Sequence, residues 1–371
     1  MIFSRSRLSA VAAALLTSTS VSAQTWTDCN PLETTCEPNT ALGMAINVDF
    51  TDGPVNSFVE AGNPTYDDDG VTFSVAASGQ APQLMSIFYI MFGRVEINMK
   101  AAQGAGIVSS LVLQSDTLDE IDLEWLGADP HEVQSNYFGK GLVTNYNRGQ
   151  FHHMERNNQE EYLTYVIDWA KDRVEFHVDG TLVRTLTYDE ADDNQYPQSP
   201  MQVKFGAWSG GDPANAEGTI AWAKGPTDFS QGPFHMAVRS IAVTDYSTGR
   251  EYRYTDNSGN WQSIEAVDGE INANEGKADE IQPTATAAAD DRGPAPSVPP
   301  GGIGTDENTA QQSGWPWEGD DRPAGGSVPE GWRMTEEGKI MPIGAASSLR
   351  APHTLFIPIS LLVGYLVILC T

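Results

Sequence analysis

The sequence predicts an all-β protein, a jelly-roll β-sandwich with a concave face that can hold an extended polymer. Three observations lead to this prediction. Many short segments alternate apolar and polar residues or are rich in β-branched residues, and turn residues separate them. Outside the two ends of the 371-residue chain, no long run has the apolar spacing of a helix. Many strands spread over about 240 residues indicate one sandwich.

The expected strands follow one another along the chain. They cover residues 44–50, 70–75, 93–99, 107–113, 163–169, 173–178, 181–186, 201–208 and 234–243. Asp179-Gly180 separates two of these segments and predicts a tight hairpin with a primed turn.

Both ends of the chain have the composition of targeting signals. Arg5 and Arg7 precede an apolar run and a small-residue exit that ends at Ala23, which predicts a secretory signal peptide over residues 1–23. The apolar run 355–370 follows small residues and a short polar spacer, the order of a glycosylphosphatidylinositol (GPI) attachment signal. We expect attachment at Gly344 and removal of the tail, so that residues 344–371 form the signal. A single-pass tail anchor is the alternative.

The rest of the chain divides into one folded domain and a stalk. We expect the domain over residues 24–264, followed at 265–343 by a disordered spacer rich in Pro, Gly and acidic residues. Cys29 and Cys36 stay in an oxidising compartment once the tail is removed, which predicts a disulfide between them. A formal charge of −29 argues against nucleic acid as a partner, because nucleic acid binds clustered Lys and Arg.

The segment DEIDLE at residues 119–124 carries the strongest chemical signal. In a strand, Glu120, Asp122 and Glu124 share one face, since successive side chains alternate between faces. Three like charges on one face do not favour folding, so a solvated face is the weaker interpretation. Two other interpretations remain. The acids could be a carboxylate pair for glycoside hydrolysis, or they could form a cation site.

Strand geometry favours catalysis. The Cα atoms of Glu120 and Glu124 are about 13 Å apart at 3.3–3.4 Å per residue, so side chains that lean together can bring their carboxyls to about 5–6 Å. A retaining glycosidase needs about 5–5.5 Å. A calcium site needs six to eight oxygens, usually gathered from a loop, and a stiff strand supplies them poorly. We therefore predict no metal.

Aromatic residues are suited to packing against sugar rings. The candidates on or beside expected strands are Trp125, Tyr137, Phe138, Trp169, Trp208 and Trp222. Each is more often a core residue than a ligand contact. Trp208 is the exception, because it precedes a Ser-Gly-Gly-Asp loop at a strand end, where binding residues gather.

The DEIDLE segment resembles the E-x-D-x-E signature of glycoside hydrolase family 16, a retaining jelly-roll family. The surrounding segments resemble the fungal Crh proteins of that family, GPI-anchored cell-wall transglycosylases that link chitin to β-glucan. The matching segments are GIVSSLVLQSD (106–116), DEIDLEWLG (119–127), NYFGKG (136–141), GTIAWA (218–223) and VTDYSTG (243–249).

The resemblance implies a role for each matching residue. Glu120 corresponds to the nucleophile, Glu124 to the general acid/base and Asp122 to the assisting carboxylate. Lys204, Trp208 and Thr219, together with Glu124, correspond to the substrate-binding cleft. The stalk departs from the family, in which many members have a Ser/Thr-rich stalk.

The expected function is therefore that of a chitin-active glycosidase and transglycosylase, acting with no cofactor. Chitin is the expected donor and β-glucan or chitin is the expected acceptor. The expected result is that the polysaccharides of the fungal cell wall are cross-linked and remodelled. We expect a monomer held by its GPI lipid at the outer face of the plasma membrane and in the wall. Two alternatives stay open, a secreted β-1,3(4)-glucanase of the same fold and a non-catalytic lectin-like wall protein. A calcium-stabilised adhesion domain is a third.

Overall fold

The computed structural model describes residues 27–55, 57–142, 147–191 and 195–276, and the backbone of three short strands further along the chain. The predicted signal peptide, Gly344 and the apolar run 355–370 lie outside the described residues. Within the described part, no helix has the length and apolar character needed to cross a membrane.

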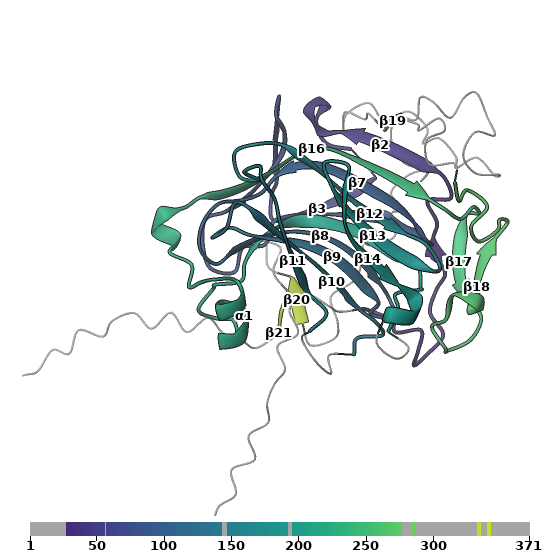
Figure 1. The fold of residues 1–371 in the computed structure, drawn as a ribbon. Coiled ribbons are helices and arrows are strands. Elements are labelled where there is room, and N and C mark those ends of the chain that lie inside the picture. The colour runs from purple at the N-terminus through teal and green to yellow at the C-terminus, as the bar shows by residue number, and fades with distance from the viewer. Residues whose placement is uncertain are drawn as a thin grey trace, which may run out of the picture.

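Two antiparallel sheets form the body of the protein (Figure 1). The seven-stranded sheet has the spatial order β11 (Gln150–His153), β10 (Glu132–Phe138), β9 (Glu120–Leu126), β8 (Ile107–Ser115), β15 (Met201–Ser209), β6 (Gln83–Ile90) and β3 (Phe58–Ala61).

The nine-stranded sheet packs against the first. Its main path is β14 (Thr181–Thr187), β13 (Arg173–Val178), β12 (Leu163–Trp169), β7 (Gly93–Lys100), β16 (Phe234–Asp245), β2 (Ala45–Asp49) and the parallel β19 (Thr284–Ala285). Beside β16 lie β5 (Gly70–Val75) and then β4 (Thr65–Asp67).

Smaller elements complete the described residues. They are the sheet β1 (Asn39–Thr40), β17 (Glu251–Tyr254) and β18 (Ile264–Val267), the pair β20 (Trp332–Met334) and β21 (Ile340–Pro342), the helix α1 (Glu217–Trp222), and the 3-10 turns η1 (Phe50–Asp52), η2 (Tyr188–Glu190), η3 (Phe229–Gln231) and η4 (Trp261–Ser263).

The core lies between the two large sheets, where alternate residues of each strand are buried. Trp125 of β9 and Tyr165 of β12 meet across the sandwich with ring centroids 4.6 Å apart in an edge-to-face arrangement. Both rings belong to one continuous buried cluster that contains residues of both sheets. The jelly-roll sandwich predicted from the strand pattern is confirmed.

Every expected strand is present, with bounds that shift by one or two residues. The hairpin at Asp179-Gly180 is also confirmed, since both residues have positive φ, 45° and 77°, as a type I′ turn requires. The strands β1, β3, β4, β6, β10, β11, β17 and β18 of the domain were not among those expected.

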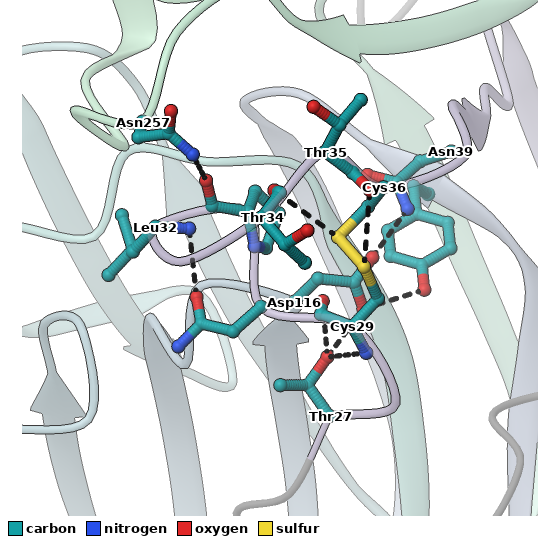
Figure 2. The surroundings of a disulfide bond; sticks show 12 residues. Thr27, Cys29, Leu32, Thr34, Thr35, Cys36, Asn39, Asp116 and Asn257 are labelled. Carbon is teal, nitrogen blue, oxygen red and sulfur yellow. Dashed lines mark hydrogen bonds between the residues drawn. A yellow bond between two sulfur atoms is a disulfide. The ribbon is translucent and has the colours of Figure 1, made fainter.

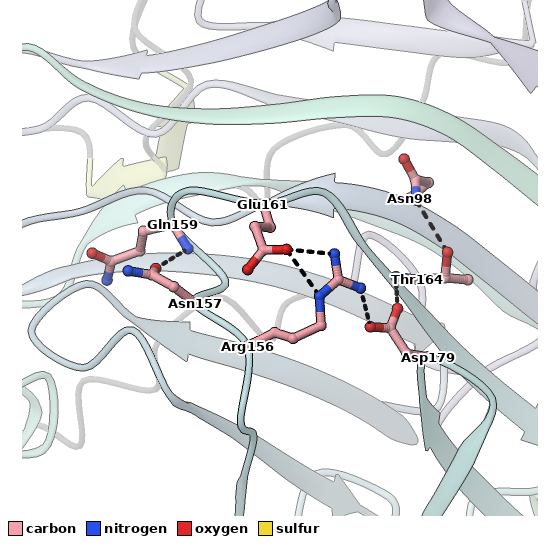
Figure 3. Close-up of polar contacts among 7 residues, drawn as sticks. All are labelled: Asn98, Arg156, Asn157, Gln159, Glu161, Thr164 and Asp179. Atoms are coloured by element: carbon pink, nitrogen blue, oxygen red, sulfur yellow. Dashed lines mark hydrogen bonds and ion pairs between the residues drawn. The ribbon is translucent and has the colours of Figure 1, made fainter.

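A surface ion network fixes this hairpin turn to the neighbouring connection (Figure 3). Arg156 donates to Glu161 Oε2 at 2.8 and 3.0 Å and to Asp179 Oδ2 at 2.6 Å. The other oxygen of Asp179 accepts from the backbone N–H of Thr164 at 2.9 Å. The groups are exposed to solvent, which screens these ion pairs, so the network contributes little to the free energy of unfolding.

The folded part extends past the boundary expected at residue 264. Strand β18 pairs with β17 over residues 264–267. Further along, the side-chain amide of Asn274 is buried and donates to the carbonyls of Asp245 and Ser247 at 3.1 and 3.3 Å. Residues 265–276 therefore belong to the domain and not to the spacer. Strands β19, β20 and β21 also fall within the stretch that was expected to be disordered.

Candidate active site

Strand β9 carries three carboxylates on one face and core residues on the other. Glu120 and Glu124 are partly exposed, and Asp122 is 2 % exposed. The opposite face is fully buried and consists of Ile121, Leu123 and Trp125. The alternation predicted for this segment is confirmed, and burial of the apolar face fixes which way the acids point.

A fourth carboxylate anchors the start of the strand. Asp119 is fully buried and accepts hydrogen bonds from the backbone N–H of Lys140 at 2.8 Å and of Gln198 at 2.9 Å. It also accepts from Ser199 Oγ at 2.7 Å. Two separate segments of the chain thus hold the residue that directly precedes Glu120.

Each carboxylate of the face lies opposite an amide side chain. Gln114 of β8 is opposite Glu120, Gln134 of β10 is opposite Glu124, and Asn136 of β10 is opposite the central acid. Residues directly opposite in antiparallel strands share a face of the sheet. Neutral amides therefore surround the acids on the strands to either side, and they can bond both carboxylates and sugar hydroxyls.

Lys204 of β15 lies on the same face, two strands from β9. The register places Lys204 opposite Val112, which is in turn opposite Asp122. Its Nζ donates to Gln114 Oε1 at 2.5 Å. Burial lowers the pKa of Lys204 to about 8, against the opposing effect of Asp116 and Glu120.

The three acids differ in the charges around them. Burial raises the pKa of all three, for Asp122 to about 7. The positive charge of Lys204 acts against this rise at Glu120, and that of Arg184 at Asp122, which also hydrogen-bonds Glu120. At Glu124 the two neighbouring acids, Asp122 and Glu120, raise the pKa further. Asp122 raises the pKa of Glu120 by its charge and by their hydrogen bond, and the same bond favours the charged form of Asp122. Among the three acids the negative charge is therefore favoured at Asp122, and the charge of Lys204 distinguishes Glu120 from Glu124, whose pKa both acidic neighbours raise.

Two tryptophans lie at the Glu124 end of this face. Trp208 of β15 is 9 % exposed and stacks on Trp222 of α1, with centroids 6.1 Å apart and planes at 24°. Trp222 Nε1 donates to Gln134 Oε1 at 3.0 Å, which ties α1 to the strand next to Glu124. Thr219 is partly exposed and lies on the same helix.

The core weighting is confirmed for three of the six aromatic candidates, while Phe138 and Trp222 are partly exposed. Trp125, Tyr137 and Trp169 are at most 3 % exposed and belong to the core. Trp222, which was weighted toward the core, is instead partly exposed and packs on Trp208. Its place in the matching segment GTIAWA was the signal that could have identified it.

The N-terminal loop lies beside Asp116, which follows β8 near the Glu120 end of the face; Figure 2 shows this loop with its disulfide and Asp116. Cys29 and Cys36 are joined by a disulfide, with Cα atoms 5.8 Å apart. Asp116, just after β8, accepts from Asn39 Nδ2 at 2.7 Å and from Tyr89 Oη at 3.2 Å. Asp116 also stabilises the protonated form of Lys204, so the loop contributes to the electrostatics of the site.

Within the described residues, no group of three or more His, Cys, Asp or Glu side chains is arranged to hold a metal ion. Carboxyl groups that share one face of a strand, as those of β9 do, are of the kind that can supply acid/base and nucleophilic chemistry.

The sequence of this chain is similar to a known family of enzymes and to several of its members. The sequence profile of glycosyl hydrolases family 16 matches residues 53–224. Crh-like protein 4 of Botryotinia fuckeliana is 56 % identical over 344 residues, which cover 90 % of each chain. Crh-like protein 4 of Aspergillus fumigatus is 47 % identical over 359 residues, 93 % of this chain and 78 % of the relative.

A solved structure agrees with these relatives. The structure of the Crh5 transglycosylase in complex with NAG superposes with a TM-score of 0.63 at 47 % identity, covering 64 % of this chain and 99 % of that one.

Proposed function

The chain belongs to glycosyl hydrolases family 16, among the fungal Crh-like proteins, and on that premise we propose that it cleaves chitin and transfers the released chain to β-glucan or chitin. Membership makes it an enzyme of the glycoside hydrolase and transglycosylase type with a cell-wall role. The donor, the acceptor and the roles of individual residues are the proposed part.

The uneven charge around the three acids is the observation that carries the mechanism. A retaining enzyme needs one ionised carboxylate and one protonated carboxyl on either side of the scissile bond. The charge of Lys204 favours an ionised Glu120 against the opposing effect of Asp122, whereas both neighbouring acids favour the proton on Glu124. We assign Glu120 as nucleophile, Glu124 as acid/base and Asp122 as the hydrogen-bonded partner that orients Glu120.

In the first step, a carboxylate oxygen of Glu120 attacks the anomeric carbon of the donor sugar. The bond from that carbon to the glycosidic oxygen breaks, and Glu124 gives its proton to that oxygen. The reducing-end fragment leaves as an alcohol, and a covalent glycosyl ester on Glu120 remains.

In the second step, Glu124 is a carboxylate and takes the proton of an acceptor hydroxyl. The acceptor oxygen attacks the anomeric carbon and the ester bond to Glu120 breaks, which restores both side chains. A sugar hydroxyl as acceptor gives a cross-link, and water gives hydrolysis.

Support for a chitin donor comes from the residues that flank the acids. Lys204, Trp208 and Thr219 are the residues proposed to bind the donor, and the stacked pair of Trp208 and Trp222 offers apolar ring surface beside Gln134. The similar Crh5 transglycosylase is described in complex with NAG, the unit of which chitin is built. A β-1,3(4)-glucanase would use the same three acids, so products must decide between the two.

Glutamine variants test the roles. Glu120→Gln and Glu124→Gln remove one ionisable group each with little change of shape. Glu96→Gln is a matched control, because Glu96 lies on β7 of the other sheet and pairs with Arg94 at 2.6 Å on the surface. Each protein is incubated with a labelled chitin oligomer and a laminarin-type acceptor, and the products are resolved by mass spectrometry.

We expect hybrid chitin–glucan products with the unaltered protein and with Glu96→Gln, and none with Glu120→Gln. Transfer by Glu120→Gln at the normal rate would refute the nucleophile. Cleavage of laminarin with no use of the chitin oligomer would establish the glucanase instead. Recovery of all oligosaccharides intact would establish the lectin-like alternative.

We further propose that the enzyme works outside the cell as a monomer, attached at Gly344 to a GPI lipid after removal of residues 1–23 and of the tail. The expected spacer, shortened at its start to follow residue 276, would separate the domain from the membrane. Release of the protein from cells by a phosphatidylinositol-specific phospholipase supports the anchor, and retention of the tail in the mature protein would contradict it.

A further inference from the structure

A hollow of about 410 Å³ lies outside the carboxylate face. Its lining residues come from the β12–β13 turn, from η2 just after β14, and from η4. None of them belongs to the seven-stranded sheet that carries the acids. The volume falls in the range of about 300–1,000 Å³ that small-molecule sites occupy.

Tyr188 forms one wall of the hollow and is held there by a buried ring. It is 43 % exposed, among the most exposed large apolar side chains of the described residues. Its ring lies 5.1 Å from that of Tyr196, which is 2 % exposed and donates through Oη to the carbonyl of Ala170 at 2.6 Å. Tyr188 therefore presents a supported ring to solvent.

Trp261 forms a second aromatic wall in the same way. It is partly exposed, and its ring packs edge-on against the fully buried Phe92 with centroids 6.4 Å apart. Its backbone N–H donates to Gln198 Oε1 at 3.2 Å. Two rings from distant parts of the sequence, each fixed by the core, thus border one hollow.

The remaining walls are polar and exposed. They are formed chiefly by Lys171, Asp172, Asp189 and Gln262. Aromatic faces with amide, carboxylate and ammonium groups around them suit a sugar chain, whose rings are apolar on their C–H faces and whose edges carry hydroxyls. A chain with a formal charge of −29 disfavours an anionic polymer. The mixed amide, carboxylate and ammonium groups of these walls suit the hydroxyls of a neutral one.

We propose that this hollow is a second carbohydrate-binding site, which holds a neutral β-linked polysaccharide by stacking on Tyr188 and Trp261. This proposal rests on the proposed function in one respect: the ligand of the hollow is taken to be a polymer of the same class as the substrates. β-Glucan and chitin share this chemistry, and the experiment below distinguishes them.

The fold connects the hollow to the Glu120 end of the active face. Gln198 accepts from Trp261 with its side chain and donates from its backbone to Asp119, the residue before Glu120. A polymer held in the hollow is thereby kept near the catalytic strand. Linked sites raise the local concentration of the polymer only for chains long enough to span both. The hollow should therefore matter for wall polymers and not for short oligosaccharides.

The test compares Tyr188→Ser and Gln262→Ala with a matched control. Leu182→Ala removes another exposed apolar side chain, 50 % exposed, from the opposite end of β14. Binding to insoluble β-glucan and to insoluble chitin is measured by sedimentation in the Glu120→Gln background, so that binding does not depend on turnover. Turnover of a short soluble oligosaccharide is measured in the otherwise unaltered enzyme.

We expect Tyr188→Ser to weaken polymer binding about tenfold, equivalent to about 1.4 kcal/mol, with Gln262→Ala in the same direction and Leu182→Ala without effect. Turnover of the short oligosaccharide should stay unchanged in all three. The polymer on which the loss is seen identifies the ligand. Unchanged binding by Tyr188→Ser, or an equal loss in Leu182→Ala, would overturn the site. Tyr188-dependent binding in a protein that transfers no chitin would keep the site and refute the proposed function.

Discussion

Replacing Asp119 tests how firmly the fold fixes Glu120, the proposed nucleophile. Asp119→Ala leaves the buried backbone N–H of Gln198 and the partly buried N–H of Lys140 without their acceptor. Ser199 Oγ keeps a second partner, Thr117 Oγ1 at 2.6 Å. Two unpaired N–H groups at about 1–3 kcal/mol each cost about 2–6 kcal/mol. Burying the carboxylate of Asp119 is itself unfavourable, as the rise of its pKa by burial indicates. Removing it therefore offsets part of the loss in the free energy of unfolding. We expect a net loss of about 3 kcal/mol in the free energy of unfolding.

Asp119→Asn is the graded comparison. Its amide oxygen can still accept from Gln198 and Ser199, but its NH₂ group faces the N–H of Lys140 and one bond is lost. We expect a loss of about 1–2 kcal/mol. Urea unfolding measures both variants. A displaced Glu120 should also lower kcat about 10–100-fold in the alanine variant, since small misplacements of a reacting group are costly. An alanine variant within 1 kcal/mol of the unaltered protein and with full kcat would refute this reasoning.

Three further predictions concern the surroundings of the acids. Lys204→Met removes the positive charge that acts against the raised pKa of Glu120, so the acidic limb of kcat/KM should move to higher pH; an unmoved limb in the pH–rate profile would contradict the assignment. Cys29→Ser opens the loop closed to Cys36 at a sequence separation of 7, and chain entropy predicts a loss of about 2.5 kcal/mol. Thermal unfolding with and without reductant measures it, and reductant should not affect the variant further. Trp222→Ala frees α1 from β10 and should raise KM for a chitin oligomer about tenfold with little change in kcat; a fall in kcat alone would show that the tryptophan acts elsewhere.

The sequence was most informative where a local pattern determines the structure. The alternation in 119–125 predicted which side chains of β9 face the core, because a strand has a period of two. Asp179-Gly180 predicted its hairpin, because both residues tolerate positive φ. Strand β10 was missed, since Glu132–Phe138 is largely polar and resembles a loop.

Contacts between distant segments were outside the reach of local patterns. Lys204 acts on Glu120 because β15 lies beside β8 in the sheet, although the two strands are far apart in the chain. Helix α1 has six residues, too short to show a helical period, and only its packing reveals the partner of Trp208. The resemblance to a known family supplied Lys204 and Thr219, which no local pattern would have singled out, whereas Trp208 was also indicated by its place at a strand end.

The two faces of β9 have a consequence for how this strand can change during evolution. Insertion or deletion of a single residue between Glu120 and Trp125 would exchange the faces beyond that point, turning a carboxylate into the core and an apolar side chain toward the substrate. The position of the acids and the packing of the core thus depend on the same alternation of side chains along the strand. We therefore expect changes of length to be tolerated in the connections on either side and not within the strand, while substitutions on neighbouring strands can alter the face without disturbing it.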